Sequence, residues 1–303
     1  MLWQVPPMKA ALLPERGIVK IAGDDARKFL NGLITSDAAK IDPRHATFAA
    51  LLTPQGKIIA DFIIAQAEAA DGGGFFLDCP RALAPTLVER FNFYKLRAKV
   101  IIEDLSEVLG VMAVWEGAAT IEYGLCYADP RLPELGQRCM LAPHRVTEAA
   151  AEIGAELVDA AAYEAHRIAL AVPRGGLDFI YGNAFPHETD MDQLGGIDFA
   201  KGCFVGQEVV SRMEHRGTAR TRVIGVRFEG FAPEPGTAVS AGQRALGTLG
   251  STAQGRGLAM LRLDRLGEAL AAGEAVTAGG IALQAIKPVW ARFSFPGEVK
   301  AAE

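Results

Sequence analysis

The residues best suited to chemistry lie in one short segment, KGCFVGQEVVSR, at positions 201–212. Lys201 can place a positive charge beside the thiol of Cys203, and Gly202 and Gly206 permit a tight backbone around the sulfur. A helix that begins after Gly206 would also stabilise a thiolate, because a helix N-terminus carries partial positive charge. A free cysteine is, however, usually a small buried hydrophobic residue. The segment by itself leaves a reactive and a structural thiol equally open.

Two carboxylates elsewhere in the chain are further candidates. In KIIADFIIAQA, strand alternation predicts Asp61 on the face opposite Ala60 and Phe62. That face is either the solvent side of a hairpin, which is the commoner case, or a cleft in which burial would perturb the carboxylate. Glu188 lies in FPHETD, where a solvated acidic loop is again the commoner case. A carboxylate can also accept two parallel N–H bonds from a guanidinium-like group, and the pterin ring of folate presents such an edge.

A basic cluster follows the cysteine segment. Its members, offset only by Glu214 and Glu229, are Arg212, His215, Arg216, Arg220, Arg222 and Arg227. They are either alternate residues of a solvated strand or a dock for an anionic tail, such as the glutamates of a folate or a phosphate. Arg97, in YKLRAKV, is a further basic candidate.

The composition excludes several classes of protein. The chain has 303 residues, of which 50% are hydrophobic and 22% charged, with a net charge of −5. This is the balance of a globular protein of one to three domains, and the acidic charge argues against direct nucleic-acid binding. The longest apolar run contains Asp61 and is too short to cross a membrane, and no signal peptide is recognisable. We therefore expect a cytoplasmic protein that does not bind membranes.

The cysteines and histidines give no metal pattern. No C-x-x-C pair occurs, and the five histidines are scattered along the chain. Widely spaced thiols in a long chain are typical of a reducing compartment. These thiols are Cys79, Cys126, Cys139 and Cys203. The sequence therefore predicts no metal site.

The hydrophobic patterns predict an α+β fold. A strand at 17–23 precedes a helix over residues 24–37, with Asp24 as N-cap and apolar residues at helical spacing up to Ile34. A hairpin turns at 53–56, and helices follow at 80–96, at 160–172 and from Gly206. After Arg220, short apolar segments separated by turn residues are typical of a small antiparallel barrel. We expect two domains, 1–229 and 230–303.

The segment KGCFVGQEVVSRM resembles the signature of the YgfZ family, folate-binding iron–sulfur cluster assembly proteins. This family lies in the superfamily of the glycine-cleavage T-protein, an aminomethyltransferase. Further resemblance is found in FLNGLITSD, GKIIADF, FYKLRAKV and FPHETDMDQLGGIDFAKGC, so it spans most of the chain and weakens in the C-terminal barrel. The resemblance implies a three-lobed fold around a central channel that holds tetrahydrofolate.

The resemblance also implies roles for individual residues. Asp61 matches the acidic position of the folate-site hairpin, Glu188 matches a pterin-binding glutamate, and Cys203 is expected to face the channel. We therefore predict Cys203 and Asp61 as catalytic residues. The predicted folate contacts are Asp61, Glu188, Arg97, Lys201, Gln207, Arg212 and Arg220.

The function implied is that of a monomeric, tetrahydrofolate-dependent accessory protein for iron–sulfur cluster assembly or repair. Its partners would be a reduced folate and client enzymes, including radical enzymes that modify tRNA. One alternative is a folate-dependent aminomethyltransferase or other one-carbon transferase, and another is a plain folate-binding module. Cys203 favours the accessory protein over the transferase, because the transferase pattern typically lacks a cysteine in this motif. The fold by itself could not decide among them.

Overall fold

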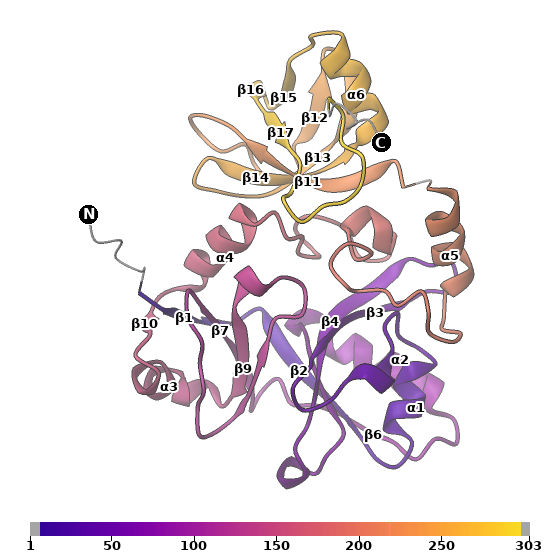
Figure 1. The fold of residues 1–303 in the computed structure, drawn as a ribbon, viewed down its shortest axis with the longest axis vertical. Helices are drawn as coiled ribbons and strands as arrows, with labels where there is room; N and C mark the ends of the chain where they lie inside the picture. The colour runs from indigo at the N-terminus through magenta and orange to yellow at the C-terminus, as the bar shows by residue number, and fades with distance from the viewer. Residues whose placement is uncertain (1–6, 218, 298–303) are drawn as a thin grey trace, which may run out of the picture. The chain divides into compact units, whose positions relative to one another are not determined.

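The structure is a computed structural model, and it describes residues 7–217 and 219–297. The chain forms two compact units (Figure 1). Within the described residues, the first unit comprises 7–163 and 194–207, and the second comprises 164–193 and 208–297 with residue 218 excepted. The cysteine segment therefore lies where the chain passes from the first unit to the second. The predicted division at residue 229 stays a prediction.

The first unit contains two five-stranded sheets. One sheet has the order β3-β4-β5-β2-β6 and is antiparallel throughout. Its strands are β2 (Arg16–Ala22), β3 (Thr47–Leu52), β4 (Ile58–Gln66), β5 (Phe75–Pro80) and β6 (Ile101–Asp104). The other sheet has the order β10-β1-β7-β9-β8, with β1 and β10 parallel. Its strands are β1 (Lys9–Leu13), β7 (Gly110–Trp115), β8 (Leu125–Ala128), β9 (Gln137–Leu141) and β10 (Glu156–Leu157).

Helices α1 (Ala26–Asn31) and α2 (Ala84–Lys95) pack on one face of the β3-β4-β5-β2-β6 sheet. The ring of Phe91 lies 6.3 Å from that of Phe62 on β4 and 6.0 Å from that of Phe29 on α1, measured between centroids. These rings belong to a buried cluster that also takes the alternate residues of β4, as strand periodicity requires. The other face of β4, which carries Asp61, is thereby turned away from the two helices.

Helix α1 is shorter than the sequence predicts. It ends at Asn31, because Ile34 and Thr35 leave the helix and bond to the neighbouring strand β3. The Thr35 N–H donates to the Ala50 carbonyl at 3.0 Å. The N-cap residue is Asp25 rather than Asp24, and its carboxylate accepts the Lys99 N–H at 2.8 Å instead of capping the helix. Tertiary pairing thus overrides the helical spacing of the apolar residues.

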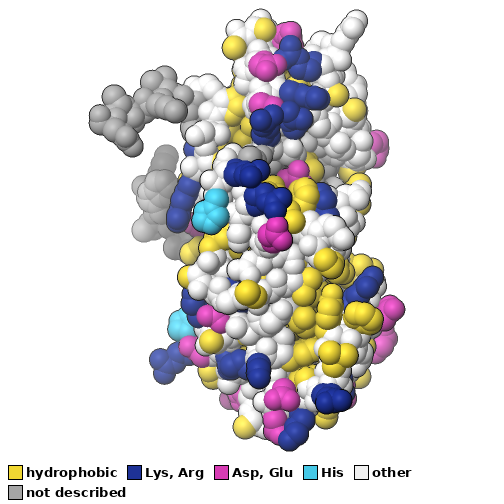
Figure 2. Space-filling view, turned by 90° about the vertical axis from the view of Figure 1, so that its right-hand side faces the viewer, with side chains coloured by type: hydrophobic (Ala, Val, Ile, Leu, Met, Phe, Trp, Pro, Cys, Tyr) yellow, Lys and Arg dark blue, Asp and Glu magenta, His cyan; other side chains and the backbone are white. Residues whose placement is uncertain are grey.

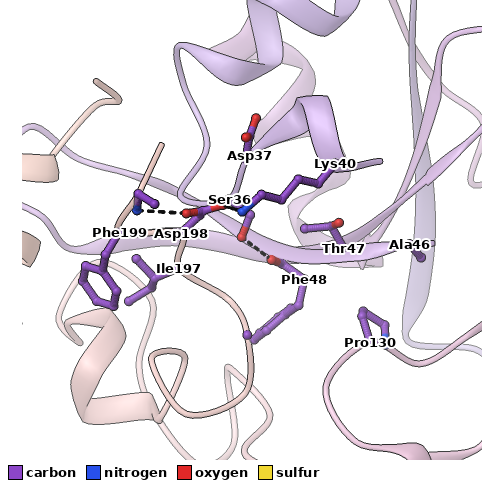
Figure 3. A pocket seen from close by; sticks show the side chains of 12 residues that line it. Ser36, Asp37, Lys40, Ala46, Thr47, Phe48, Pro130, Ile197, Asp198 and Phe199 are labelled. Carbon is purple, nitrogen blue, oxygen red and sulfur yellow. Dashed lines mark hydrogen bonds and ion pairs between the residues drawn. The ribbon is translucent and has the colours of Figure 1, made fainter. Parts of the chain in front are cut away.

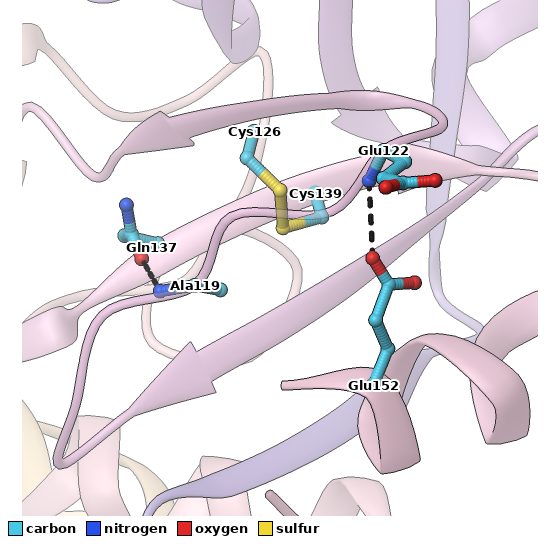
Figure 4. Close-up of a disulfide and its surroundings, with 6 residues drawn as sticks. All are labelled: Ala119, Glu122, Cys126, Gln137, Cys139 and Glu152. Carbon is cyan, nitrogen blue, oxygen red and sulfur yellow. Dashed lines mark hydrogen bonds between the residues drawn. A yellow bond between two sulfur atoms is a disulfide. The ribbon is translucent and has the colours of Figure 1, made fainter. Parts of the chain in front are cut away.

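The expectation of four free thiols is wrong. Cys126 on β8 and Cys139 on β9 are directly opposite in the strand register, with Cα atoms 4.1 Å apart, and form a disulfide (Figure 4). Helix α3 (Val146–Glu152) packs into the same cluster as Cys139. The sequence alone could not reveal this pair, because the thirteen-residue separation has no metal or redox signature. Among the described residues, Cys79 and Cys203 are the free cysteines.

The second unit is built around the predicted antiparallel barrel. Its seven strands have the order β16-β15-β12-β13-β14-β11-β17. They are β11 (Thr221–Arg227), β12 (Ala238–Ala241), β13 (Arg244–Ala253), β14 (Arg256–Arg262), β15 (Val276–Ala278), β16 (Ile281–Ala282) and β17 (Gln284–Ile286). Helix α6 (Leu263–Ala271), which the sequence analysis did not identify, contributes Leu266 and Ala269 to the barrel core. Helix α5 (Gln207–Arg216) leads toward the barrel, and α4 (Ala160–Ala169) ends before Pro173 as predicted.

No helix in residues 7–217 and 219–297 is long and apolar enough to cross a membrane. Some large apolar side chains of the first unit are nevertheless exposed. Phe93 and Leu96, at the end of α2, are 73% and 91% exposed, and Ile101 on edge strand β6 is 60% exposed. Figure 2 shows hydrophobic side chains gathered on the lower half of the side where α2 lies in Figure 1.

Candidate functional site

Lys201 anchors the cysteine segment within the first unit. Its ammonium donates to the backbone carbonyls of Asn31 at 2.8 Å, Ile34 at 2.6 Å and Ser36 at 2.9 Å. These carbonyls belong to the last residue of α1 and to residues just after it, where no intrahelical donor is available to them. Burial lowers the pKa of Lys201 to about 8. The three N–H groups of the ammonium are thus used to hold the backbone, and the predicted contact of Lys201 with folate stays a prediction.

Gly206 anchors the other end of the segment. Its φ is +83°, and a Cβ atom there would lie 2.7 Å from the Thr53 carbonyl oxygen in the turn between β3 and β4. Only glycine fits this backbone and this approach. Between the two anchors, Phe204 is buried and Cys203 is exposed. The loop therefore presents the Cys203 thiol to solvent while both of its ends are fixed.

Gln207 is the first residue of α5 and is partly buried. It follows the Gly206 anchor directly, so its position is set by the same contact with the β3–β4 turn. Its predicted contact with folate stays a prediction.

Asp61 lies in a buried, charged part of the first unit. It is 7% exposed, so the solvent-facing alternative does not hold. Neighbouring Arg16 donates from Nε to Asp78 at 2.5 Å. Burial would lower the pKa of Arg16, but the charge of Asp78 and, more weakly, that of Asp61 raise it well above its ordinary value. Arg138 bonds the other Asp78 oxygen at 2.7 Å, which links the two sheets of the unit. Asp61 is therefore a carboxylate held among buried charges.

A cavity of about 560 Å³ opens beside the cysteine segment (Figure 3). Phe48 on β3 forms part of its wall, and Lys40 and Asp198 make an ion pair at its edge. Burial raises the pKa of Asp198, but its hydrogen bonds, above all with Lys40, give a net lowering. Phe48 is two residues before Ala50, which pairs with Asp61, so Phe48 and Asp61 share one face of the sheet. The cavity is of a size that suits a small organic molecule.

Glu188 lies in the second unit, on the short 3-10 turn Pro186–Thr189. One of its carboxylate oxygens, Oε2, accepts the backbone N–H of Phe185 at 2.9 Å. This reciprocal capping contact holds the turn, and the side chain is half-buried. Glu188 is therefore an oriented carboxylate and not a mobile loop residue.

Arg222 is not an exposed anion dock. It is 6% exposed, and its two Nη atoms bond the two oxygens of Asp192 at 2.6 and 2.9 Å. Its Nη1 also donates to the His187 carbonyl at 2.7 Å and lies 3.2 Å from Asp190. Burial raises the pKa of Asp190 well above its ordinary range, although Arg222 opposes the shift. This part of the basic cluster therefore serves as a buried ion-pair network.

The same network creates a grouping that the sequence spacing did not reveal. His187, Asp192 and Glu214 each place one ligand-type atom within 4.8 Å of the others. The His187 ring nitrogen Nε2 lies 3.0 Å from a Glu214 oxygen. Both oxygens of Asp192 bond the Arg222 guanidinium, so an ion-pair network accounts for the grouping. The absence of a metal site stays a prediction.

The remaining predicted residues are exposed. Arg97 follows α2 in the first unit, Arg220 precedes β11, and Arg212 on α5 pairs with Glu208 at 2.5 Å. The first unit thus holds Asp61, Arg97, Lys201, Cys203 and Gln207, and the second holds Glu188, Arg212 and Arg220. Their contacts with folate stay predictions.

Comparison with known proteins identifies the fold and the family. A model of the C-terminal β-barrel domain of CAF17 matches residues 220–293. The aminomethyltransferase T of the glycine cleavage system from Bartonella henselae has a TM-score of 0.71 over 95% of this chain and 88% of that one, at 13% identity. The mitochondrial iron-sulfur cluster assembly factor IBA57 of Homo sapiens is 31% identical over 261 residues, covering 79% of this chain and 71% of the human protein.

A fungal relative is more similar but longer. The IBA57 homolog of Mycosarcoma maydis is 35% identical over 233 residues, covering 73% of this chain and 57% of the fungal protein. The matched part of the Neurospora crassa homolog is likewise 54% of its length. The chain therefore spans little more than half of these fungal proteins.

The fold is that of the glycine-cleavage aminomethyltransferase with a C-terminal barrel, as the sequence predicted. Within that fold, the chain belongs to the IBA57 family of iron–sulfur cluster assembly factors. The relatives are described as mitochondrial, which contradicts the expected cytoplasmic location. That expectation rested on the lack of a recognisable targeting pattern, which does not identify a compartment.

Proposed function

We propose that this chain is a reduced-folate-binding accessory protein for iron–sulfur cluster assembly or repair in client enzymes, including radical enzymes that modify tRNA. Its membership of a family of iron–sulfur cluster assembly factors is the observation that carries the proposal. The resemblance of residues 201–213 to the folate-binding YgfZ signature supports the folate part. The mitochondrial setting of the named relatives is the setting that we propose for this activity.

In this proposal Asp61 and Glu188 are carboxylates that contact the folate. Asp61 contributes a buried charge, and the neighbouring cavity at Phe48 supplies an apolar wall on the same sheet face. Glu188 contributes a carboxylate whose orientation is fixed by the Phe185 N–H. That bond uses one acceptor position, and a carboxylate offers about four, so the edge of a pterin can still be recognised. The exposed arginines Arg97, Arg212 and Arg220 would meet the anionic tail.

Cys203 is the group that we propose acts on the client or its cluster. It is exposed on a loop whose two ends are fixed at Lys201 and Gly206, so the thiol has a defined position. A positioned, accessible thiol is suited to contact a partner protein.

Calorimetry with tetrahydrofolate tests the folate part. We expect saturable binding that weakens by about 1.5–3 kcal/mol in Glu188→Ala, the usual loss for a hydrogen bond to a charged group. Glu188→Gln is the matched control, because its amide oxygen can still cap Phe185 while its charge is lost. Equal folate affinity in all three proteins, or no binding in the parent, would contradict the proposal.

Complementation tests the assembly part. In cells that lack their own copy of the gene, the parent chain should restore the activity of iron–sulfur enzymes, and Cys203→Ser should not. If the parent chain and Glu188→Ala restore these enzymes equally well, the assembly function stands. The need for folate is then rejected. Failure of a stably folded parent chain to restore any client would contradict the proposal as a whole.

The rival function is one-carbon transfer, as in an aminomethyltransferase. We expect negligible formation of methylene-tetrahydrofolate when the chain is mixed with the other glycine-cleavage proteins and tetrahydrofolate. A rate comparable to that of a genuine T-protein would favour the rival.

A further inference from the structure

The barrel of the second unit places two arginines directly opposite each other. Arg227, the last residue of β11, pairs in register with Arg256, the first residue of β14. On its other side Arg227 pairs with Gln284, the first residue of β17. Directly paired residues point to the same face, with Cβ atoms about 4.5–5.5 Å apart, and like charges in this arrangement repel. Three adjacent strands thus present Arg256, Arg227 and Gln284 in one row.

The two charges lack a carboxylate partner. Within the described residues, the side chain of Arg227 makes no ion pair or hydrogen bond, and that of Arg256 donates only to the Ala169 carbonyl, at 3.4 Å. Other barrel arginines are neutralised, since Arg244 pairs with Glu268 and Arg262 pairs with Asp264. The barrel therefore concentrates unpaired positive charge at one position.

These arginines line a cavity of about 790 Å³. Two tight hairpin tips bound it. Gln254 and Gly255 have φ values of 50° and 71°, and Gly279 and Gly280 have values of 55° and 83°, which is the backbone of type I′ turns. The Phe228 N–H donates to the Gly255 carbonyl at 3.0 Å, which ties one tip to the end of β11. The two arginines therefore project from paired strands whose hairpins are closed by two-residue turns.

The lining also indicates what the cavity can hold. Its charged residues are Arg227, Arg256 and one carboxylate, Glu229, so one positive charge is in excess. Ile281 and Leu283 give an apolar wall, and Gln254 and Gln284 give amide groups. A single carboxylate ligand can engage only one guanidinium fork in a bidentate manner. A dianionic phosphate has oxygens for both forks and offsets both charges.

We propose that this cavity binds the phosphate group of a phosphorylated organic molecule through Arg227 and Arg256. The apolar wall and the two amides would then contact the rest of the molecule. The site goes beyond the proposed folate-dependent function and depends on no residue of it. The alternative is that both arginines are simply solvated, since water screens like charges at an exposed surface.

The test uses the full chain with phenyl phosphate, inorganic phosphate and the monocarboxylate benzoate, at constant ionic strength. We expect saturable calorimetric binding of phenyl phosphate, weaker binding of inorganic phosphate and no detectable binding of benzoate. Arg227→Gln and Arg256→Gln should each weaken the binding of phenyl phosphate at least about tenfold, the effect of losing a hydrogen-bonded contact between charged groups. Arg244→Gln and Arg262→Gln are matched controls, because each removes one barrel arginine charge at a paired position, and they should bind normally.

Two further measurements keep the outcomes separate. Without ligand, Arg227→Gln should melt at the same or a higher temperature than the parent, because the repulsion with Arg256 is removed. Phenyl phosphate should raise the melting temperature of the parent and not that of the variant.

Flotation with phosphatidylcholine vesicles, with and without phosphatidic acid, distinguishes a lipid headgroup from a soluble phosphate. No saturable binding to any phosphate, or equal loss in the two control variants, would overturn the proposal.

Discussion

The two free cysteines differ in their exposure to solvent, which decides whether a reagent can reach the thiol. Cys79 is fully buried on β5, and burial raises the pKa of its thiol to about 12. Cys203 is exposed on the loop between Lys201 and Phe204. Since the thiolate is the nucleophile, a buried and protonated thiol reacts slowly. The two positions should therefore separate cleanly in a labelling experiment.

We expect iodoacetamide to alkylate Cys203 at neutral pH and to leave Cys79 unmodified until the chain is unfolded. Mass spectrometry of the peptides over time measures both rates in one sample. Tetrahydrofolate should slow the reaction at Cys203 if the thiol faces the folate site. Cys203→Ser should melt as the parent does, because the side chain is exposed. Alkylation of Cys79 at the same rate as Cys203 would show that Cys79 is not buried.

The carbonyls held by Lys201 give a second prediction. Lys201→Met should lower the free energy of unfolding by at least about 2 kcal/mol, because carbonyls left without donors cost about 1–3 kcal/mol each. Urea denaturation measures this. Lys40→Met is the matched control, since Lys40 pairs with Asp198 at the surface and should change stability little. Equal effects of the two substitutions would exclude the anchoring role.

Lys201 also sets a pH dependence. Burial lowers its pKa to about 8 from an ordinary 10.5, so between these values the unfolded chain binds more protons than the folded one. Stability contributed by this group therefore rises with pH across that window. The stability difference between the parent and Lys201→Met should grow from about pH 8 upward, and a flat difference would contradict the assignment.

Elements with strong local patterns were predictable, and those set by distant contacts were not. The β3–β4 hairpin, α2, α4 and α5 follow from turn residues and apolar spacing. Helix α1 ends early because residues 34 and 35 bond to β3, and nothing local signals that pairing. The face of Asp61 followed from strand alternation, but its burial did not, because burial depends on the charged residues packed against that face. Arg222 likewise looked like an exposed base until its partners Asp190 and Asp192 were located.

The β8–β9 pair carries a prediction at this scale. Closing the loop between Cys126 and Cys139 should stabilise the fold by about 3 kcal/mol, the value for a loop of roughly this length. Urea denaturation with and without a reducing agent measures the difference. Cys79→Ala, reduced in the same way, is a control that keeps the disulfide pair. Alkylation before reduction should modify neither Cys126 nor Cys139, and modification of both would show that the disulfide is absent.

Across the whole molecule, the sequence predicted the fold class, and the comparisons identified the family. The cysteine segment carried most of that information, because Lys201 and Gly206 meet specific backbone atoms of the first unit. The compartment could not be predicted in this way, since no contact in the fold encodes it. The surroundings of Asp61 and Glu188 could not be predicted from spacing, because burial and the bond from the Phe185 N–H arise only in the folded chain.

The number of available thiols limits how one chain can bind an iron–sulfur cluster. Iron–sulfur clusters are usually held by four cysteine thiolates. Of the four cysteines, Cys126 and Cys139 are joined to each other and Cys79 is fully buried. A single chain can therefore offer only Cys203 to a cluster, and we expect the isolated monomer to hold no cluster.

After anaerobic reconstitution and desalting, the monomer fraction from size-exclusion chromatography should lack visible cluster absorption and stoichiometric iron. Any cluster that survives should elute with more than one protein chain and be lost in Cys203→Ser. A stable cluster on the monomer would mean that other residues supply its ligands, and the chain would then be a cluster protein in its own right.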